Sequence, residues 1–180
     1  MSQKEDRIAI GLGANLSSER VGRPENTIVS ALSSLDSEEI KLISEAGLYR
    51  SAPIPAGSGP WYVNTVALVE TKLEPIALLK HLHSIEAAYG RVRDEINAPR
   101  TLDLDLLIYH DQVTGWPTSE RVGLEQPLTI PHPRMHERAF VLLPLAELML
   151  DWVHPVLGKT VEAMAAEVQD QAIARMSEPL

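Results

Sequence analysis

The stretch PRTLDLDLLIY, residues 99–109, places two aspartates inside a run that is otherwise almost wholly apolar. Side chains alternate between the two faces of a strand, so a strand here would carry both acids on one side. That face is predicted to hold Asp103, Asp105, Leu107 and Tyr109. The opposite face is predicted to be wholly apolar and to hold Leu102, Leu104, Leu106 and Ile108. The predicted strand therefore has one face for a core and one for chemistry.

The spacing of the two aspartates indicates a cation site. On a strand their Cα atoms would be about 6.6 Å apart, and their repulsion would be on the order of 3 kcal/mol at an effective dielectric constant of about 20. A hard divalent cation offsets such repulsion, because magnesium prefers one or two carboxylates together with water and phosphate oxygens. The plainer interpretation is that the acids form the solvent-facing side of an edge strand, which shows the same alternation.

Three arginines precede the acid pair, at Arg91, Arg93 and Arg100. Their planar guanidinium groups fit phosphate oxygens with two hydrogen bonds each. Cations beside a metal-binding carboxylate pair favour a nucleoside triphosphate, since metal and arginines would neutralise the same phosphate chain from two sides.

Outward from this strand, the apolar pattern predicts alternating strands and helices. Strands are expected at residues 7–15, 40–51 and 61–72, and helices at residues 23–35 and 74–90. With the strand at 102–109 the order is βαββαβ, which is typical of a ferredoxin-like α+β fold, an antiparallel sheet with both helices on one face. Further C-terminal strand or helix elements are expected, among them helices at 141–150 and 159–174.

The composition limits the class of protein. A chain of 180 residues with 44% apolar residues fits a single domain spanning residues 1–180. A net charge of -9 argues against a nucleic-acid partner. The absence of cysteine removes disulfides and thiolate metal sites, and the N-terminal residues predict neither a signal peptide nor a membrane span. We expect a cytoplasmic protein with no membrane contact, as a monomer or weak homodimer.

Several motifs resemble one enzyme family in order along the chain. They are IGLGANL (10–16), WYVNTVALVET (61–71), GRVR (90–93), PRTLDLDLLIY (99–109) and LTIPHPRMHERAFVLLPLAE (128–147). Together, from about residue 7 to about residue 160, they resemble the 6-hydroxymethyl-7,8-dihydropterin pyrophosphokinases of folate biosynthesis. The resemblance implies transfer of pyrophosphate from ATP to the hydroxymethyl oxygen of the pterin, giving AMP and the pterin diphosphate with two magnesium ions.

The resemblance also implies roles for individual residues, carried over position by position. The metal ligands would be Asp103 and Asp105, which would be catalytic together with Arg91 and Arg100. The ATP site would comprise Glu86, Arg91, Arg93, Arg100, Leu106, Thr129, His132 and Arg138. The pterin site would comprise Ser51, Ala52, Ile54, Tyr62, Asn64 and Phe140. A flat heterocycle with polar edges calls for one stacking ring and a few directional hydrogen bonds.

The chain departs from the family pattern in its loops. Asn97 stands where family members often carry a tryptophan that covers the pterin, Pro127 where an arginine is frequent, and Pro133 where some members have an aromatic residue. The loops at 52–60 and 93–99 are predicted to be mobile and to close over the substrates.

Three alternatives remain open from the sequence. The acid pair would also suit a glycosyltransferase or nucleotidyltransferase with a D-x-D metal site. A ferredoxin-like module without catalysis could bind a small ligand or a protein. His132 and His136, spaced by four residues, could ligate zinc, although no third ligand motif accompanies them.

Overall fold

The computed structural model describes residues 7–18, 21–53, 55, 57, 59–90, 101–116 and 128–177. In this part of the chain one antiparallel sheet of six strands has the order β5-β1-β4-β3-β6, with β2 paired to the other half of β4. The strands are β1 (Ile8–Ala14), β2 (Ile40–Glu45), β3 (Tyr49–Ser51), β4 (Tyr62–Thr71), β5 (Asp103–Tyr109) and β6 (Ile173–Arg175).

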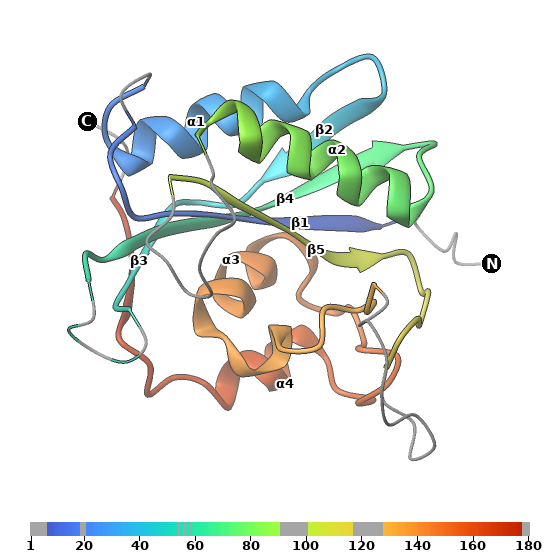
Figure 1. The fold of residues 1–180 in the computed structure, drawn as a ribbon. Coiled ribbons are helices and arrows are strands. Elements are labelled where there is room, and N and C mark those ends of the chain that lie inside the picture. The colour runs from blue at the N-terminus through green and yellow to red at the C-terminus, as the bar shows by residue number, and fades with distance from the viewer. Residues whose placement is uncertain are drawn as a thin grey trace.

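Helices cover both faces of the sheet (Figure 1). One face carries α1 (Pro24–Leu35) and α2 (Pro75–Ala88), and the other carries α3 (Ala139–Met149) and α4 (Val161–Ala166). A 3₁₀ turn, η1 (Met135–Glu137), precedes α3. The strands β5, β1, β4 and β2, with α1 and α2, form the expected ferredoxin-like βαββαβ unit, so the predicted fold class is confirmed.

Local sequence explains where the first two helices begin and where α2 ends. Both start with a proline, Pro24 and Pro75, whose fixed φ and missing N–H suit the first helical position. After α2, Gly90 adopts a φ of +84°, the left-handed conformation that ends a helix and that glycine adopts without strain.

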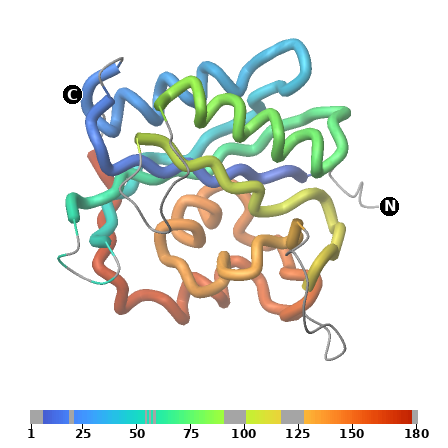
Figure 2. The backbone as a smooth tube through the Cα atoms, in the orientation of Figure 1, coloured from blue at the N-terminus to red at the C-terminus, as the bar shows by residue number. Residues whose placement is uncertain are grey.

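The C-terminal part differs from the expected long helix at 159–174. Only α4 is helical, and residues Ile173–Arg175 pair instead with β3 as strand β6. Pairing with residues 173–175 gives hydrogen-bond partners to backbone groups that β3 would otherwise expose at the sheet edge. This gain outweighs the weak helical preference of these residues. The expected strand at 40–51 is likewise divided into β2 and β3. Figure 2 shows the C-terminal segment that contains β6, in red, at the edge of the sheet opposite β5.

A β-bulge in β5 corrects the predicted alternation. Ala9 of β1 pairs with Ile108 but the next residue, Ile10, pairs with Leu106, so Leu107 is the extra residue. Beyond it the two faces exchange. Tyr109 therefore packs under α1 and α2 with its hydroxyl donating to the Leu73 carbonyl at 2.8 Å, while Ile108 packs on the face with α3.

Each face of the sheet has its own core. The first core, under α1 and α2, includes Leu12, Leu104 and Leu106. The second core joins Leu107 and Ile108 to residues of α3 and α4. In the described part of the chain, no helix is long and apolar enough to cross a membrane.

A polar network ties β3 and β6 to α3. The Glu147 carboxylate accepts hydrogen bonds from the Tyr49 hydroxyl (2.6 Å), the Arg175 Nε (2.8 Å) and the Gly47 backbone N–H (3.0 Å). The Arg175 bond is the main cause that lowers the pKa of Glu147 to about 2, and burial together with Glu147 raises the pKa of Tyr49 to about 12. The network fixes β3, whose last residue is Ser51.

Candidate active site

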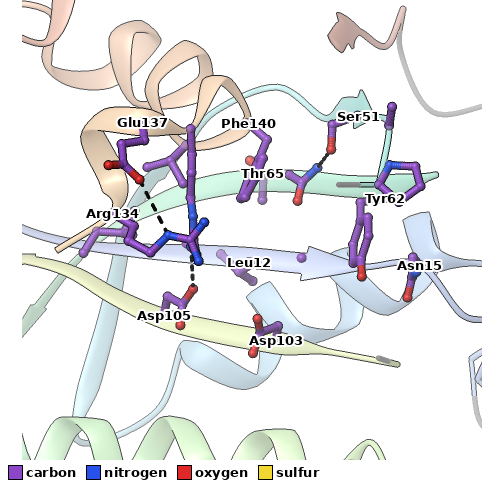
Figure 3. A pocket seen from close by; sticks show the side chains of 18 of the residues that line it. Leu12, Asn15, Ser51, Tyr62, Thr65, Asp103, Asp105, Arg134, Glu137 and Phe140 are labelled. Atoms are coloured by element: carbon purple, nitrogen blue, oxygen red, sulfur yellow. Dashed lines mark hydrogen bonds and ion pairs between the residues drawn. The ribbon is translucent and has the colours of Figure 1, made fainter. Parts of the chain in front are cut away.

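A cleft of about 570 Å³ opens beside the second core. Its floor comes from β1, β4 and β5, one side from residues 51–53 at the end of β3, and the facing wall from residues between 132 and 141. In Figure 3, Asp103 and Asp105 lie along one strand, with Arg134, Glu137 and Phe140 on the segment that faces them. Chain segments far apart in the sequence therefore meet around one cavity.

Two glycines of β1 line the floor of the cleft and place no side chain in it. Gly11 pairs with Asp105 and Gly13 pairs with Asp103 in the register of β1 and β5. A Cβ atom at Gly13 would lie 3.2 Å from the Asn64 Oδ1, so any side chain there would press on that amide. The residues paired with the two acids on β1 therefore place no side chain beside them.

Arg138 faces the acid pair from the opposite wall. Its Nη1 lies 3.8 Å from the Asp105 Oδ2, and the two side chains are 20% and 38% exposed. Burial lowers the pKa of Arg138, and the carboxylate of Asp105 acts in the other direction. Beside it, the Arg134 Nε lies 3.6 Å from the Glu137 Oε2. This end of the cleft thus combines carboxylates with guanidinium groups.

His132 lies on the same wall as a neutral donor. Burial is the main cause that lowers its pKa to about 4, with the charges of Arg138 and Arg134 adding to it and Asp103 opposing. The Arg134 backbone N–H donates to the His132 Nδ1 at 3.2 Å, so in the neutral ring the proton is on Nε2. The backbone N–H of His132 donates to the Leu107 carbonyl at 2.8 Å, which fixes the wall to β5.

The other half of the cleft suits a flat polar ring. Asn64 is 4% exposed and its Nδ2 donates to the Ser51 Oγ at 2.9 Å, which fixes the orientation of the amide. Phe140 and Tyr62 also line the cleft. The Arg138 guanidinium lies 5.5 Å from the centre of the Phe140 ring, a cation–π distance. Arg138 therefore stands where the two halves of the cleft join.

The carboxylate pair fits magnesium better than zinc. Among the described residues, no three histidine, cysteine, aspartate or glutamate side chains gather as a metal-ligand group. Magnesium needs only one or two carboxylates when phosphate and water complete its shell, and Asp103 and Asp105 both line the cleft. His136 belongs to an aromatic cluster instead, with its ring centre 6.3 Å from those of Trp116 and His154.

The structure gathers most of the described site candidates in this cleft. Those that line it are Ser51, Ala52, Tyr62, Asn64, Asp103, Asp105, His132, Arg138 and Phe140. Three others lie elsewhere. Glu86 is fully buried and accepts a hydrogen bond from the Leu104 N–H at 2.8 Å, Leu106 packs in the first core, and the Thr129 hydroxyl lies 3.5 Å from the Gly115 carbonyl.

Some candidates fall outside the described residues. These are Arg91, Arg93, Arg100 and Ile54, together with the departures at Asn97 and Pro127 and the predicted closing loop at 93–99. Of the loop at 52–60, Pro53, Pro55 and Gly59 line the cleft.

Sequence reasoning missed several residues that line the cleft. Arg134 and Glu137 lie between two residues that were proposed, and Asn15 donates from Nδ2 to the Pro60 carbonyl at 3.4 Å. Gly11 and Gly13 gave a usable signal, because glycines two apart in a strand leave one stretch of a sheet face without side chains.

Comparison with known proteins agrees with this geometry. A family model described as 7,8-dihydro-6-hydroxymethylpterin-pyrophosphokinase (HPPK) matches residues 9–150. The chain belongs to this family. It is 39% identical to the 2-amino-4-hydroxy-6-hydroxymethyldihydropteridine pyrophosphokinase of Pseudomonas aeruginosa, over 89% of this chain and 91% of that protein. A protein of the same name from Haemophilus influenzae is 39% identical over 81% of this chain and 83% of its own length.

Longer HPPK relatives contain the matching region as a part. The folic acid synthesis protein fol1 of Pneumocystis carinii is 33% identical over 93% of this chain, which spans only 21% of that protein. The crystal structure of Plasmodium falciparum HPPK-DHPS superposes with a TM-score of 0.66 at 16% identity, over 90% of this chain and 43% of that one. The structural likeness supports the fold.

Proposed function

We propose that the chain is a 2-amino-4-hydroxy-6-hydroxymethyldihydropteridine diphosphokinase of folate biosynthesis. It transfers the pyrophosphoryl group of ATP to 6-hydroxymethyl-7,8-dihydropterin and releases AMP and the pterin diphosphate. One observation carries this assignment: the acid pair Asp103 and Asp105 lines the same cleft as the fixed amide of Asn64 and the ring of Phe140, with Arg138 between the halves. We further propose that it acts as a monomer or a weak homodimer.

The phosphate half of the cleft positions ATP and neutralises its charge. Arg138 can direct its guanidinium from the Asp105 carboxylate, 3.8 Å away, to phosphate oxygens. His132 adds a neutral Nε2–H donor, which needs no protonation in order to bind an anion. Arg91, Arg93 and Arg100, which resemble phosphate ligands in sequence, would complete this set.

The pterin half orients the acceptor. The Asn64 amide, with its Nδ2 engaged by Ser51, presents a carbonyl oxygen to an N–H edge of the ring. Phe140 offers a stacking surface, and Ser51, Ala52 and Tyr62 form the remaining wall. Positioning the hydroxymethyl oxygen in line with the β-phosphorus is the main task here, because phosphoryl transfer depends chiefly on alignment and charge neutralisation.

Asp103 and Asp105 would hold two magnesium ions together with phosphate oxygens. When bound, magnesium would offset the negative charge of the triphosphate and favour ionisation of the hydroxymethyl group.

The identity of the nucleotide product tests the proposal. The protein is incubated with magnesium, ATP and 6-hydroxymethyl-7,8-dihydropterin, and the nucleotides are separated by chromatography. We expect AMP, formed in equal amount with the pterin diphosphate and only when pterin is present. ADP as the product, or nucleotide turnover that ignores pterin, would indicate another magnesium-dependent transferase, and no turnover with intact pterin binding would indicate a binding module.

A further inference from the structure

Gln171 lies behind the wall of the cleft and contacts its backbone on both sides of Arg138. The Ala139 backbone N–H donates to the Gln171 Oε1 at 3.0 Å, and the Gln171 Nε2 donates to the Glu137 carbonyl at 2.7 Å. One amide side chain thus holds the peptide groups that precede and follow the residue opposite Asp105.

The start of α3, which forms part of this wall, makes a hydrogen bond with a residue outside the helix. Arg138 is the N-cap residue of α3, and its side chain makes no capping hydrogen bond. The first N–H groups of a helix lack partners within it, and Gln171 supplies one for Ala139 from 32 residues farther along the chain. Arg138 itself joins η1 to α3 in an extended conformation, with φ −120° and ψ 108°. The Arg138 backbone is also held directly, because its N–H donates to the Met135 carbonyl at 3.3 Å and its carbonyl accepts from the Leu142 N–H at 3.0 Å. Gln171 adds hydrogen bonds to the next peptide group on each side.

The same short segment also supports the other wall. Ile173 pairs with Ser51 in β6 and β3, and the Ala52 N–H donates to the Ala172 carbonyl at 3.0 Å. A small cavity of about 160 Å³ lies between Gln171 and Phe140. Residues 171–173 therefore connect the wall that carries Arg138 with the one that carries Ser51.

This contact joins two parts of the chain that the family comparison separates. The family model ends at residue 150, so it includes Arg138 and excludes Gln171.

We propose that Gln171 is a positioning residue for pyrophosphoryl transfer, which sets the direction of the Arg138 side chain by fixing the backbone from 137 to 139. The inference rests on the proposed function. Loss of the two Gln171 hydrogen bonds would let the Arg138 side chain shift relative to Asp105 and Phe140. A misplacement of about 1 Å can reduce a rate on the order of 100-fold.

A double-mutant cycle tests the proposal with the full-length protein. Gln171→Met keeps the length of the side chain and removes both hydrogen bonds, while Gln169→Met makes the same change at an exposed position nearby. We expect Gln171→Met to lower kcat about 10-fold with the KM for both substrates within about threefold, and Gln169→Met to match wild type. Gln171→Glu retains the acceptor alone and should lie between wild type and Gln171→Met.

The decisive comparison is made in the Arg138→Ala background. If Gln171 acts through Arg138, adding Gln171→Met should lower single-turnover rates by less than twofold further. An equal loss in both backgrounds, or wild-type kcat in folded Gln171→Met, would overturn the proposal while AMP formation by wild type upholds the function. If Gln171→Met does not fold, Gln171→Glu is held to the same criteria. A wild-type protein that forms no AMP would overturn both.

Discussion

The two faces of β1 and β5 have opposite properties although their residues alternate along the same strands. On the first face Leu12, Leu104 and Leu106 are at most 3% exposed and pack under α1 and α2. On the second face the intervening positions include Gly13 and Asp103, which border an open cleft. The first face supplies the burial that stabilises the sheet, so the second can hold acids and empty space at its open end.

The second face is itself divided along its length. The bulge residue Leu107 and its neighbour Ile108 pack in the second core with residues of α3, whereas Asp103 and Asp105 line the cleft. A single strand therefore passes from core to site within a few residues. Substitutions on the two faces should separate loss of chemistry from loss of stability.

The largest effect should follow from the acids. Asp103→Asn and Asp105→Asn keep the size of the side chain and remove the charge that would hold magnesium, so we expect kcat to fall about 1000-fold with little change in melting temperature. Steady-state AMP formation at saturating magnesium, together with thermal unfolding, measures both. Asp151→Asn, at an exposed turn, is the matched control. A variant of either cleft acid that keeps a tenth of the wild-type kcat would contradict the assignment.

Leucines on the other face should give the reverse pattern. Leu104→Ala and Leu106→Ala remove fully packed side chains, and each should lower the free energy of unfolding by about 2 to 5 kcal/mol. Turnover per folded molecule should stay near wild type. Denaturant unfolding and active-site titration separate the two quantities, and a selective fall in kcat would mean that the faces are coupled.

The sequence predicted the contrast between the two faces of β5 only where side chains alternate regularly along the strand. Asp103 to Leu107 alternate as predicted, but the extra residue opposite the step from Ala9 to Ile10 depends on pairing with another strand. Tyr109 consequently lies on the face opposite to the one predicted. The prediction of a long C-terminal helix was wrong for the same reason. The local pattern of residues 159–174 does not show that the edge of β3 is available for pairing.

The candidate site shows a similar limit. The resemblance pointed to several of the residues that line the cleft, such as Asn64 and Arg138, because motif positions specify side-chain chemistry. It gave no indication of Gln171, whose side chain accepts a hydrogen bond from the backbone N–H of Ala139, 32 residues earlier in the chain. Leu106 lies on the apolar face, as the alternation predicts. The ATP contact that the resemblance implies for it stays a prediction.

A smaller effect should distinguish the two floor glycines. A Cβ at Gly13 would lie 3.2 Å from the Asn64 Oδ1, which is buried and fixed through Ser51, whereas at Gly11 it would meet the tip of the Leu107 side chain at 3.3 Å. Gly13→Ala should therefore raise the KM for pterin about 10-fold and leave the KM for ATP within twofold. Gly11→Ala should change both less than threefold, because the end of a leucine can move. Equal effects of the two changes on pterin would mean that the Asn64 amide does not direct binding.

The smallest effect concerns two histidines on the side of the sheet that holds the cleft. Burial lowers the pKa of His132 and of His154 to about 4, with Arg138 adding at the first and His136 at the second. The unfolded chain binds protons near pH 6.5 and the folded chain does not, so the stability that these groups contribute is present above pH 6.5 and is lost as the pH falls toward 4. Each should account for about 1.5 kcal/mol between pH 6.5 and 5, measured by urea unfolding.

His132→Gln isolates the histidine that lines the cleft. The variant should lose stability about half as steeply as wild type below pH 6.5 and run parallel to it above pH 7.5. Saturating magnesium and ATP should then reduce the acid loss in wild type, since phosphate oxygens favour the protonated ring, but not in His132→Gln. A nucleotide effect of equal size in both proteins would place His132 outside phosphate contact.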